Sequence, residues 1–198
     1  MKRQDLLLLA VFCLLIAIGA AGRLGQPMWN FTPLAAVGLF AGRYFANTGI
    51  AIAVPLIALL IGDLVSPSHT NFGVMLAVYG SLAMPALLGR WLRRPVVKEC
   101  PVKERPVSQR RHIARWVTCL LAPSLIFFVT TNFAVWALHG YYAKTFAGLV
   151  ECYVAAIPFY RTMLTGDLIY SAMLFGGAAL AGVRYPEATS DVGSDAAS

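Results

Sequence analysis

Two acidic residues lie in long apolar stretches of this 198-residue chain, each within the triplet Gly-Asp-Leu. Asp63 is near the end of "PLIALLIGDLV", and Asp167 lies inside "TMLTGDLIYSAMLFGGAAL". A charged side chain at the centre of a bilayer costs about 2.5 to 3.5 kcal/mol on insertion scales, so it normally faces a polar partner or a wet cavity. Two chemistries would use such acids: holding the polar end of a small molecule, or acting as a carboxylate pair on a lipid or quinone.

The composition indicates a membrane protein. Hydrophobic residues make up 59% of the chain and charged residues 13%, whereas soluble domains carry about 25% charged residues. A helix needs about 20 apolar residues to cross the hydrocarbon core. We therefore expect an all-α fold, a polytopic membrane helix bundle with about six transmembrane helices, formed by one integral domain over residues 1–185.

Helix breakers and polar clusters divide the apolar runs into six predicted spans. These are residues 5–22, 33–47, 49–65, 72–92, 113–138 and 158–183. Residues 93–111 are predicted to be a basic cytoplasmic loop, and residues 186–198 a flexible C-terminal tail. Thr32 is suited to cap the second span, with Pro33 at its first position. Because this span is short, residues 33–65 could also form one broken span or a re-entrant hairpin.

A topology with both termini in the cytoplasm satisfies the positive-inside rule. It leaves only three basic residues outside, and these are Arg23, Lys144 and Arg161. It also brings the four tryptophans to the interfaces, with Trp29 and Trp136 outside and Trp91 and Trp116 inside. The N-terminal segment is similar to a signal peptide, but we interpret it as a retained first span. The predicted location is the bacterial cytoplasmic (inner) membrane.

Several polar residues share the outer half of this topology with the two acids. Asp167 lies about 14 Å below the outer start of its helix. It should face inward, with Tyr170 on the same helical face. The residues expected to line a pocket open to the exterior are Asp167, Asn132, Asp63, Arg161, Tyr170, Tyr79, Asn71 and Asn30.

The same residues also have purely structural explanations. Asp63 could cap the turn "SPSH" that follows it. Asp167 could pair with Arg161 or accept hydrogen bonds from neighbouring helices. Asn30 and Asn71 each precede a predicted span, so both could be helix caps.

Residues 141–160 have apolar side chains spaced for one helical face but begin too polar for a span. We expect a short outer helix over the polar cluster. Residues 144–157 would then act as a lid or simply seal the bundle.

Other chemistries lack a sequence signal. The four cysteines and three histidines do not have metal-ligand spacing, and there is no Gly-rich nucleotide loop. We expect no metal, no cofactor, no enzymatic activity and no nucleic-acid partner. The basic residues are explained by attraction to the lipid bilayer.

At "NFTPLAAVGLFAGRYF", "PLIALLIGDLV", "TNFAVWA" and "GLVECYVAAIPFYRTMLTGDLIYSAMLFG" the sequence resembles an uncharacterised bacterial membrane family that looks like the substrate-binding subunits of energy-coupling-factor transporters. The resemblance implies a six-helix bundle that captures a vitamin-like solute from outside. It also implies partner transmembrane and ATP-binding subunits that energise uptake. Those subunits carry an A-x-x-x-A docking pattern in the first helix. Here the pattern is Ala17 with Ala21, near the outer end. An accessory or assembly subunit of a larger membrane complex is the alternative.

Overall fold

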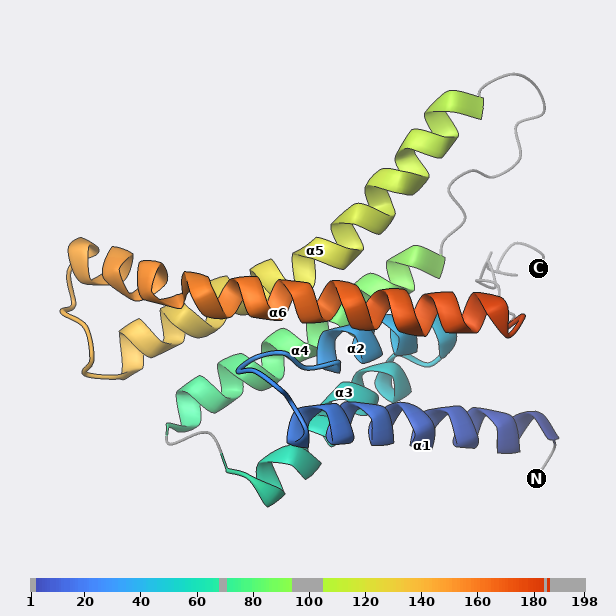
Figure 1. The fold of residues 1–198 in the computed structure, drawn as a ribbon, viewed down its shortest axis with the longest axis horizontal. Helices are drawn as coiled ribbons and strands as arrows, with labels where there is room; N and C mark the ends of the chain where they lie inside the picture. The colour runs from blue at the N-terminus through green and yellow to red at the C-terminus, as the bar shows by residue number, and fades with distance from the viewer. Residues whose placement is uncertain (1–2, 68–70, 94–104, 184, 186–198) are drawn as a thin grey trace, which may run out of the picture.

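The described part of the protein is a bundle of six α-helices without strands (Figure 1). The computed structural model describes residues 3–67, 71–93, 105–183 and 185. The helices are α1 (Arg3–Leu24), α2 (Leu34–Tyr44), α3 (Thr48–Val65), α4 (Phe72–Arg93), α5 (Arg105–Leu138) and α6 (Phe146–Leu180). All but α2 are long and apolar enough to cross a membrane. The predicted all-α class is confirmed.

Successive helices run in opposite directions, so the start of α1 and the end of α6 lie at the same end of the bundle (Figure 1). The opposite end, where α1 and α3 finish, also carries the start of α4. The 11 residues of α2 cover only about half of a hydrocarbon core. Residues 33–65 therefore form a short helix and a long one, and the short one follows a non-helical connection from α1.

Helix α2 lies at the centre of the bundle because small residues let α4 approach it closely. Nine of its 11 residues are buried. A Cβ added at Gly42 would lie 1.9 Å from the carbonyl oxygen of Ala86. On the facing helix, a Cβ at Gly89 would lie 2.1 Å from the carbonyl oxygen of Leu39. Any larger side chain at either glycine would force the two backbones apart.

Helices α5 and α6 are longer than the spans predicted for them. Their 34 and 35 residues correspond to about 50 Å of helix each. Thr145 caps α6, since its hydroxyl accepts a hydrogen bond from the Gly148 amide at 3.2 Å. The helix then continues through Pro158, where the sixth span was predicted to begin. Proline suits a helix start, and inside a helix it removes one hydrogen bond and its ring crowds the preceding turn, but membrane helices tolerate this where neighbouring groups satisfy the freed carbonyl.

Two predicted segments change as a result. The separate outer helix predicted within residues 141–160 is the first part of α6. Residues 105–111, predicted as part of the basic loop, are helical, whereas residues 94–104 and the predicted tail at 186–198 lie outside the described residues.

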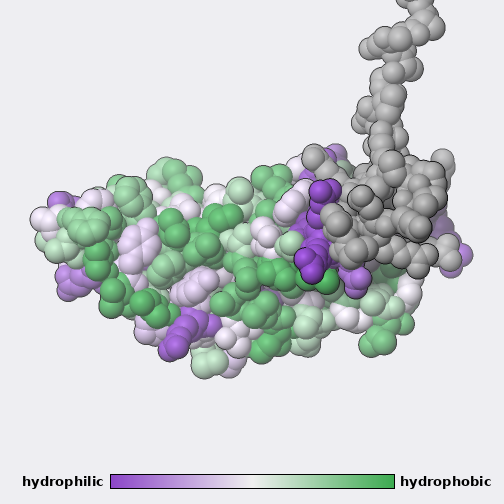
Figure 2. Space-filling view, turned by 90° about the horizontal axis from the view of Figure 1, so that it is seen from above, coloured by the Kyte–Doolittle hydropathy of each residue, from purple (hydrophilic) through white to green (hydrophobic). Residues whose placement is uncertain are grey.

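The surface of the bundle is that of a membrane-embedded protein. Apolar residues cover most of the face seen in Figure 2, and hydrophilic residues form small groups on it. In the most apolar part of α1 only 17% of the residues are buried. Soluble monomers rarely expose apolar surface on this scale, which indicates that these side chains face a membrane.

A candidate binding cavity between the helices

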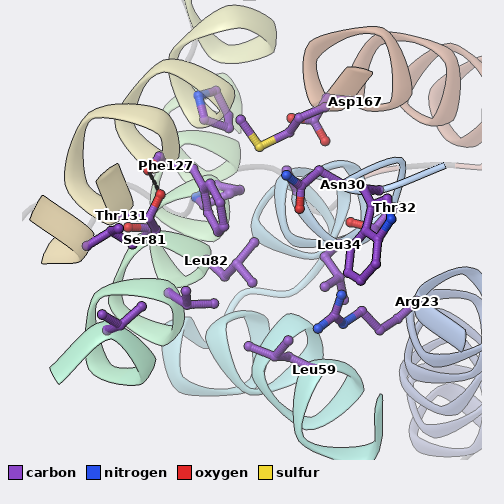
Figure 3. Close-up of a pocket in the computed structure, with 18 residues that line it drawn as sticks. Arg23, Asn30, Thr32, Leu34, Leu59, Ser81, Leu82, Phe127, Thr131 and Asp167 are labelled. Carbon is purple, nitrogen blue, oxygen red and sulfur yellow. Dashed lines mark hydrogen bonds between the residues drawn. The ribbon is translucent and has the colours of Figure 1, made fainter. Parts of the chain in front are cut away.

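A cavity of about 280 Å³ lies among the helices near the end where α1 finishes (Figure 3). All six helices and the connection between α1 and α2 contribute to its wall. The apolar or aromatic lining residues include Trp29, Leu34, Leu59, Val78, Leu82, Phe127 and Met163. The polar ones are Arg23, Asn30, Thr32, Ser81, Thr131 and Asp167.

Asp167 lies on the α6 side of this cavity and is 4% exposed. The Ser124 hydroxyl on α5 donates a hydrogen bond of 2.6 Å to its Oδ2 atom. The preceding residue, Gly166, has no side chain to keep the α1–α2 connection away, since an added Cβ would lie 3.2 Å from the Phe31 ring. The predicted inward orientation of Asp167 is confirmed. Its suggested partner, Arg161, is exposed instead.

The second acid lies within an ion pair across the cavity from Asp167. Arg23 Nη2 is 3.3 Å from Asp63 Oδ1, and the Tyr79 hydroxyl donates to Asp63 Oδ2 at 3.1 Å. Both members of the ion pair are largely buried, with 17% and 13% of their side chains exposed. Gly62 makes room for the arginine, because an added Cβ would lie 2.6 Å from Arg23 Cγ. Arg23 lines the cavity, whereas its partner Asp63 does not belong to the lining.

The connection between α1 and α2 places an amide and a hydroxyl at the cavity. Asn30 has a φ of 64°, in the left-handed region that asparagine tolerates better than most residues. Its side chain lies between Asp167 and α2 (Figure 3). Neither Asn30 nor Thr32 caps α2: Pro33 is the N-cap and makes no side-chain capping bond there. The predicted Thr32 cap is therefore wrong, and this hydroxyl lines the cavity instead.

The start of α2 also borders the cavity, through Leu34 and Ala35. The first regular backbone bond of this helix joins the Val37 amide to the Pro33 carbonyl at 2.8 Å. The amides before it have no partner within the helix, and together they give this end a partial positive charge.

Asn132, predicted to hold a ligand, lies outside the cavity lining. Its amide nitrogen donates to the Phe128 carbonyl of its own helix at 2.8 Å. The preceding residue, Thr131, lines the cavity in its place. One residue corresponds to about 100° of rotation around a helix, so a small error in the assumed helix face is enough to exchange them.

Three other predicted residues have roles outside the cavity lining. Asn71 caps α4, accepting hydrogen bonds from the Gly73 and Val74 amides at 2.9 and 3.3 Å. This confirms its structural explanation. Tyr170 packs against the Phe31 ring, with 5.4 Å between the ring centroids. Tyr79 does not line the cavity either, and its hydroxyl bonds to Asp63, the partner of the lining residue Arg23.

Several cavity residues were missed by the sequence analysis although their spacing carries a signal. On α5, Phe127 and Thr131 stand three and seven residues after Ser124, which is the spacing of one helical face. On α4, Val74, Val78 and Ser81 follow the same pattern. Small hydroxyl residues within a span are often packing residues, so this pattern alone does not predict a cavity.

The chain matches a family of unknown function, DUF6580, over residues 3–188. It belongs to this family. No curated protein and no solved structure matches it.

In this DUF6580 member, the α4 and α5 walls of the cavity offer hydrogen-bond acceptors. The Ser81 and Thr131 hydroxyls donate to carbonyls of their own helices, at 2.6 and 2.7 Å. Their oxygens are therefore left to accept hydrogen bonds from a ligand. Among the described residues no group of three His, Cys, Asp or Glu could hold a metal. Of the two acids, only Asp167 lines the cavity, so they do not form a pair there.

Proposed function

We propose that the protein is a solute-binding subunit for uptake of a small, vitamin-like molecule across the bacterial cytoplasmic (inner) membrane. The cavity of about 280 Å³ carries this proposal. Its few polar groups are held at separate points of an apolar wall, which is the usual construction of a small-molecule site. The proposed role is binding and transport, and the hypothesis of two acids acting together on one lipid or quinone is weakened because only Asp167 of the two lines the cavity.

The charge distribution supports an outward-facing cavity. At the other end of the bundle, arginines bond to carbonyls where α2 and α4 end. Arg43 donates to the Leu92 carbonyl, and Arg93 donates to the Phe45 carbonyl at 2.7 Å. By the positive-inside rule that arginine-rich end faces the cytoplasm. The termini would then be cytoplasmic, and the cavity would open toward the exterior.

Partner subunits would supply the energy. The sequence lacks a Gly-rich nucleotide loop, so ATP hydrolysis requires another chain. The resemblance to substrate-binding subunits of energy-coupling-factor transporters suggests coupling transmembrane and ATP-binding subunits as those partners.

A cavity-filling substitution tests the proposal. Val78 lines the cavity, whereas Leu76 on the same helix is 54% exposed. Native mass spectrometry of the protein in mild detergent should detect a retained small molecule in the wild type and in Leu76→Phe, but not in Val78→Phe. Equal retention in both variants would place the molecule elsewhere. The absence of any molecule in all three proteins would refute solute binding.

The alternative is an accessory or assembly subunit of a larger membrane complex. The length of α5 and α6 favours it, because about 50 Å of helix exceeds a hydrocarbon core of about 30 Å. Both helices project beyond the rest of the bundle (Figure 1). Companion chains without any small molecule in the mass spectrum would support this function instead.

A further inference from the structure

We propose that the cavity binds a small organic cation, such as a protonated amine or a cationic nitrogen heterocycle, whose charge pairs with the Asp167 carboxylate. This inference rests on the proposed solute-binding function and names the class of ligand. It follows from the charges that line the cavity and from what neutralises each of them.

The one cation among the lining residues is already compensated. Arg23 pairs with Asp63 at 3.3 Å, and Gly62 lets the arginine side chain lie against α3 to reach that acid. The Tyr79 hydroxyl holds the same carboxylate from α4. The ion pair as a unit therefore contributes no net charge to the cavity wall.

No charged side chain pairs with the Asp167 carboxylate within the described part of the chain, and the partial positive charge at the start of α2 amounts to only about half a unit charge. The carboxylate accepts a hydrogen bond from a neutral hydroxyl, that of Ser124, and it is in no ion pair. The side chain is 4% exposed, so bulk water does not solvate it. Burying a carboxylate without a counter-ion is costly, and one neutral hydrogen bond offsets only part of that cost. A ligand that brings one positive charge would complete the site.

The rest of the wall suits an organic cation better than a metal ion. Phe127 and Trp29 line the same cavity, and the faces of aromatic rings attract cations. Apolar residues complete the wall and would cover the carbon skeleton of a ligand. Hard metal ions are usually held by several carboxylates, whereas the described residues contain no cluster of three His, Cys, Asp or Glu side chains, and Asp167 is the one acid in the lining. The volume of about 280 Å³ limits the ligand to a compact molecule.

Three probes of nearly equal shape and different charge test this inference. They are 2-phenylethylamine, 2-phenylethanol and phenylacetate, which at neutral pH are a cation, a neutral molecule and an anion. Binding is measured by isothermal titration calorimetry on the full chain in mild detergent. We expect the amine to bind at least tenfold more tightly than the alcohol, and the anion to bind most weakly.

Asp167→Asn should reduce amine binding at least tenfold and leave alcohol binding unchanged. Arg161→Gln changes the charge of an exposed position on the same helix, so it should alter neither. Far-UV circular dichroism and the melting temperature check that each variant is folded. If Asp167→Asn does not fold, Asp167→Glu, which keeps the charge, should retain the preference for the amine.

The remaining outcomes separate this inference from the proposed function. Equal affinity for the three probes, a preference for the anion, or no amine binding to the wild type overturns the cation assignment. None of these three results decides whether the protein binds a solute. That question is decided by native mass spectrometry of the wild type and Val78→Phe. Amine binding that survives Val78→Phe lies outside the cavity and overturns the inference on its own.

Discussion

The ion pair between Arg23 and Asp63 should couple the end of α1 to the end of α3. The perturbations are Asp63→Asn, Arg23→Gln and the double variant. In the wild type the two charges approach to 3.3 Å, with 17% and 13% of the side chains exposed. Asp63→Asn removes the negative charge that pairs with Arg23 and leaves an uncompensated charge in the cavity wall. Arg23→Gln leaves the carboxylate with its hydrogen bond from Tyr79.

The size of the effect follows from this geometry. Two unit charges 3.3 Å apart attract by about 5 kcal/mol at an effective dielectric constant of roughly 20. Desolvation of the two groups offsets much of this attraction, because both are largely buried. We expect each single variant to lower the free energy of unfolding by about 2 kcal/mol. The double variant should lose about 1 to 2 kcal/mol less than the sum of the two, which is the coupling energy.

Reversible unfolding in mixed detergent micelles, followed by circular dichroism, measures these differences. Arg161→Gln is the matched control, since it removes an exposed arginine and should change the free energy of unfolding by less than about 0.5 kcal/mol. Additive losses, with a coupling energy below about 0.3 kcal/mol, would show that the pair does not form. In that case Arg23 could neutralise Asp167, and the cavity would not require a cationic ligand.

Three further predictions concern the elements that position the cavity, and each is checked by thermal unfolding in detergent. Asn30→Ala should cost about 1 kcal/mol because asparagine tolerates the left-handed backbone at φ 64° better than alanine does, whereas Asn30→Gly should be nearly neutral because glycine adopts this conformation without strain. Gly42→Ala should destabilise by at least about 1 to 3 kcal/mol, since its Cβ would lie 1.9 Å from the Ala86 oxygen, while Gly80→Ala, with nothing within 4 Å, should not destabilise. Asn71→Ala should cost about 1 kcal/mol through loss of the α4 cap.

The fold could be predicted from the sequence because its main signals are local. Apolar runs of sufficient length predict membrane helices, and the polar residues between them mark where the runs end. Asn71 was recognisable as a cap for the same reason, since its hydrogen bonds go to residues two and three positions later. Helix boundaries at prolines were less predictable. Pro158 lies within α6 because packing of a long helix can outweigh one missing backbone hydrogen bond.

The site was only partly predictable because its contacts join distant parts of the chain. Arg23 and Asp63 are 40 positions apart, and Ser124 and Asp167 are 43 apart. No local pattern says which hydroxyl meets a buried carboxylate. The depth of Asp167 in its helix predicted an inward orientation correctly. The choice of Asn132 over Thr131 failed because it depended on the rotation of α5 about its axis, which tertiary packing sets.

The two Gly-Asp-Leu triplets have a common physical reason that the sequence alone did not reveal. In each, the glycine is the point where the end of α1 or the connection after it approaches: Arg23 at Gly62 and Phe31 at Gly166. A small residue beside each acid thus lets one continuous segment, from Arg23 to Phe31, pack against α3 and α6. The acids differ in what meets them. One triplet supplies the counter-ion of Arg23. In the other, the carboxylate accepts a hydrogen bond from the Ser124 hydroxyl and forms no ion pair with the described residues. The same kind of packing contact therefore accompanies an ion pair, Arg23 with Asp63, on one side of the cavity. On the other side it accompanies a carboxylate, that of Asp167, without an ion pair among the described residues. It is this asymmetry that favours a cationic ligand.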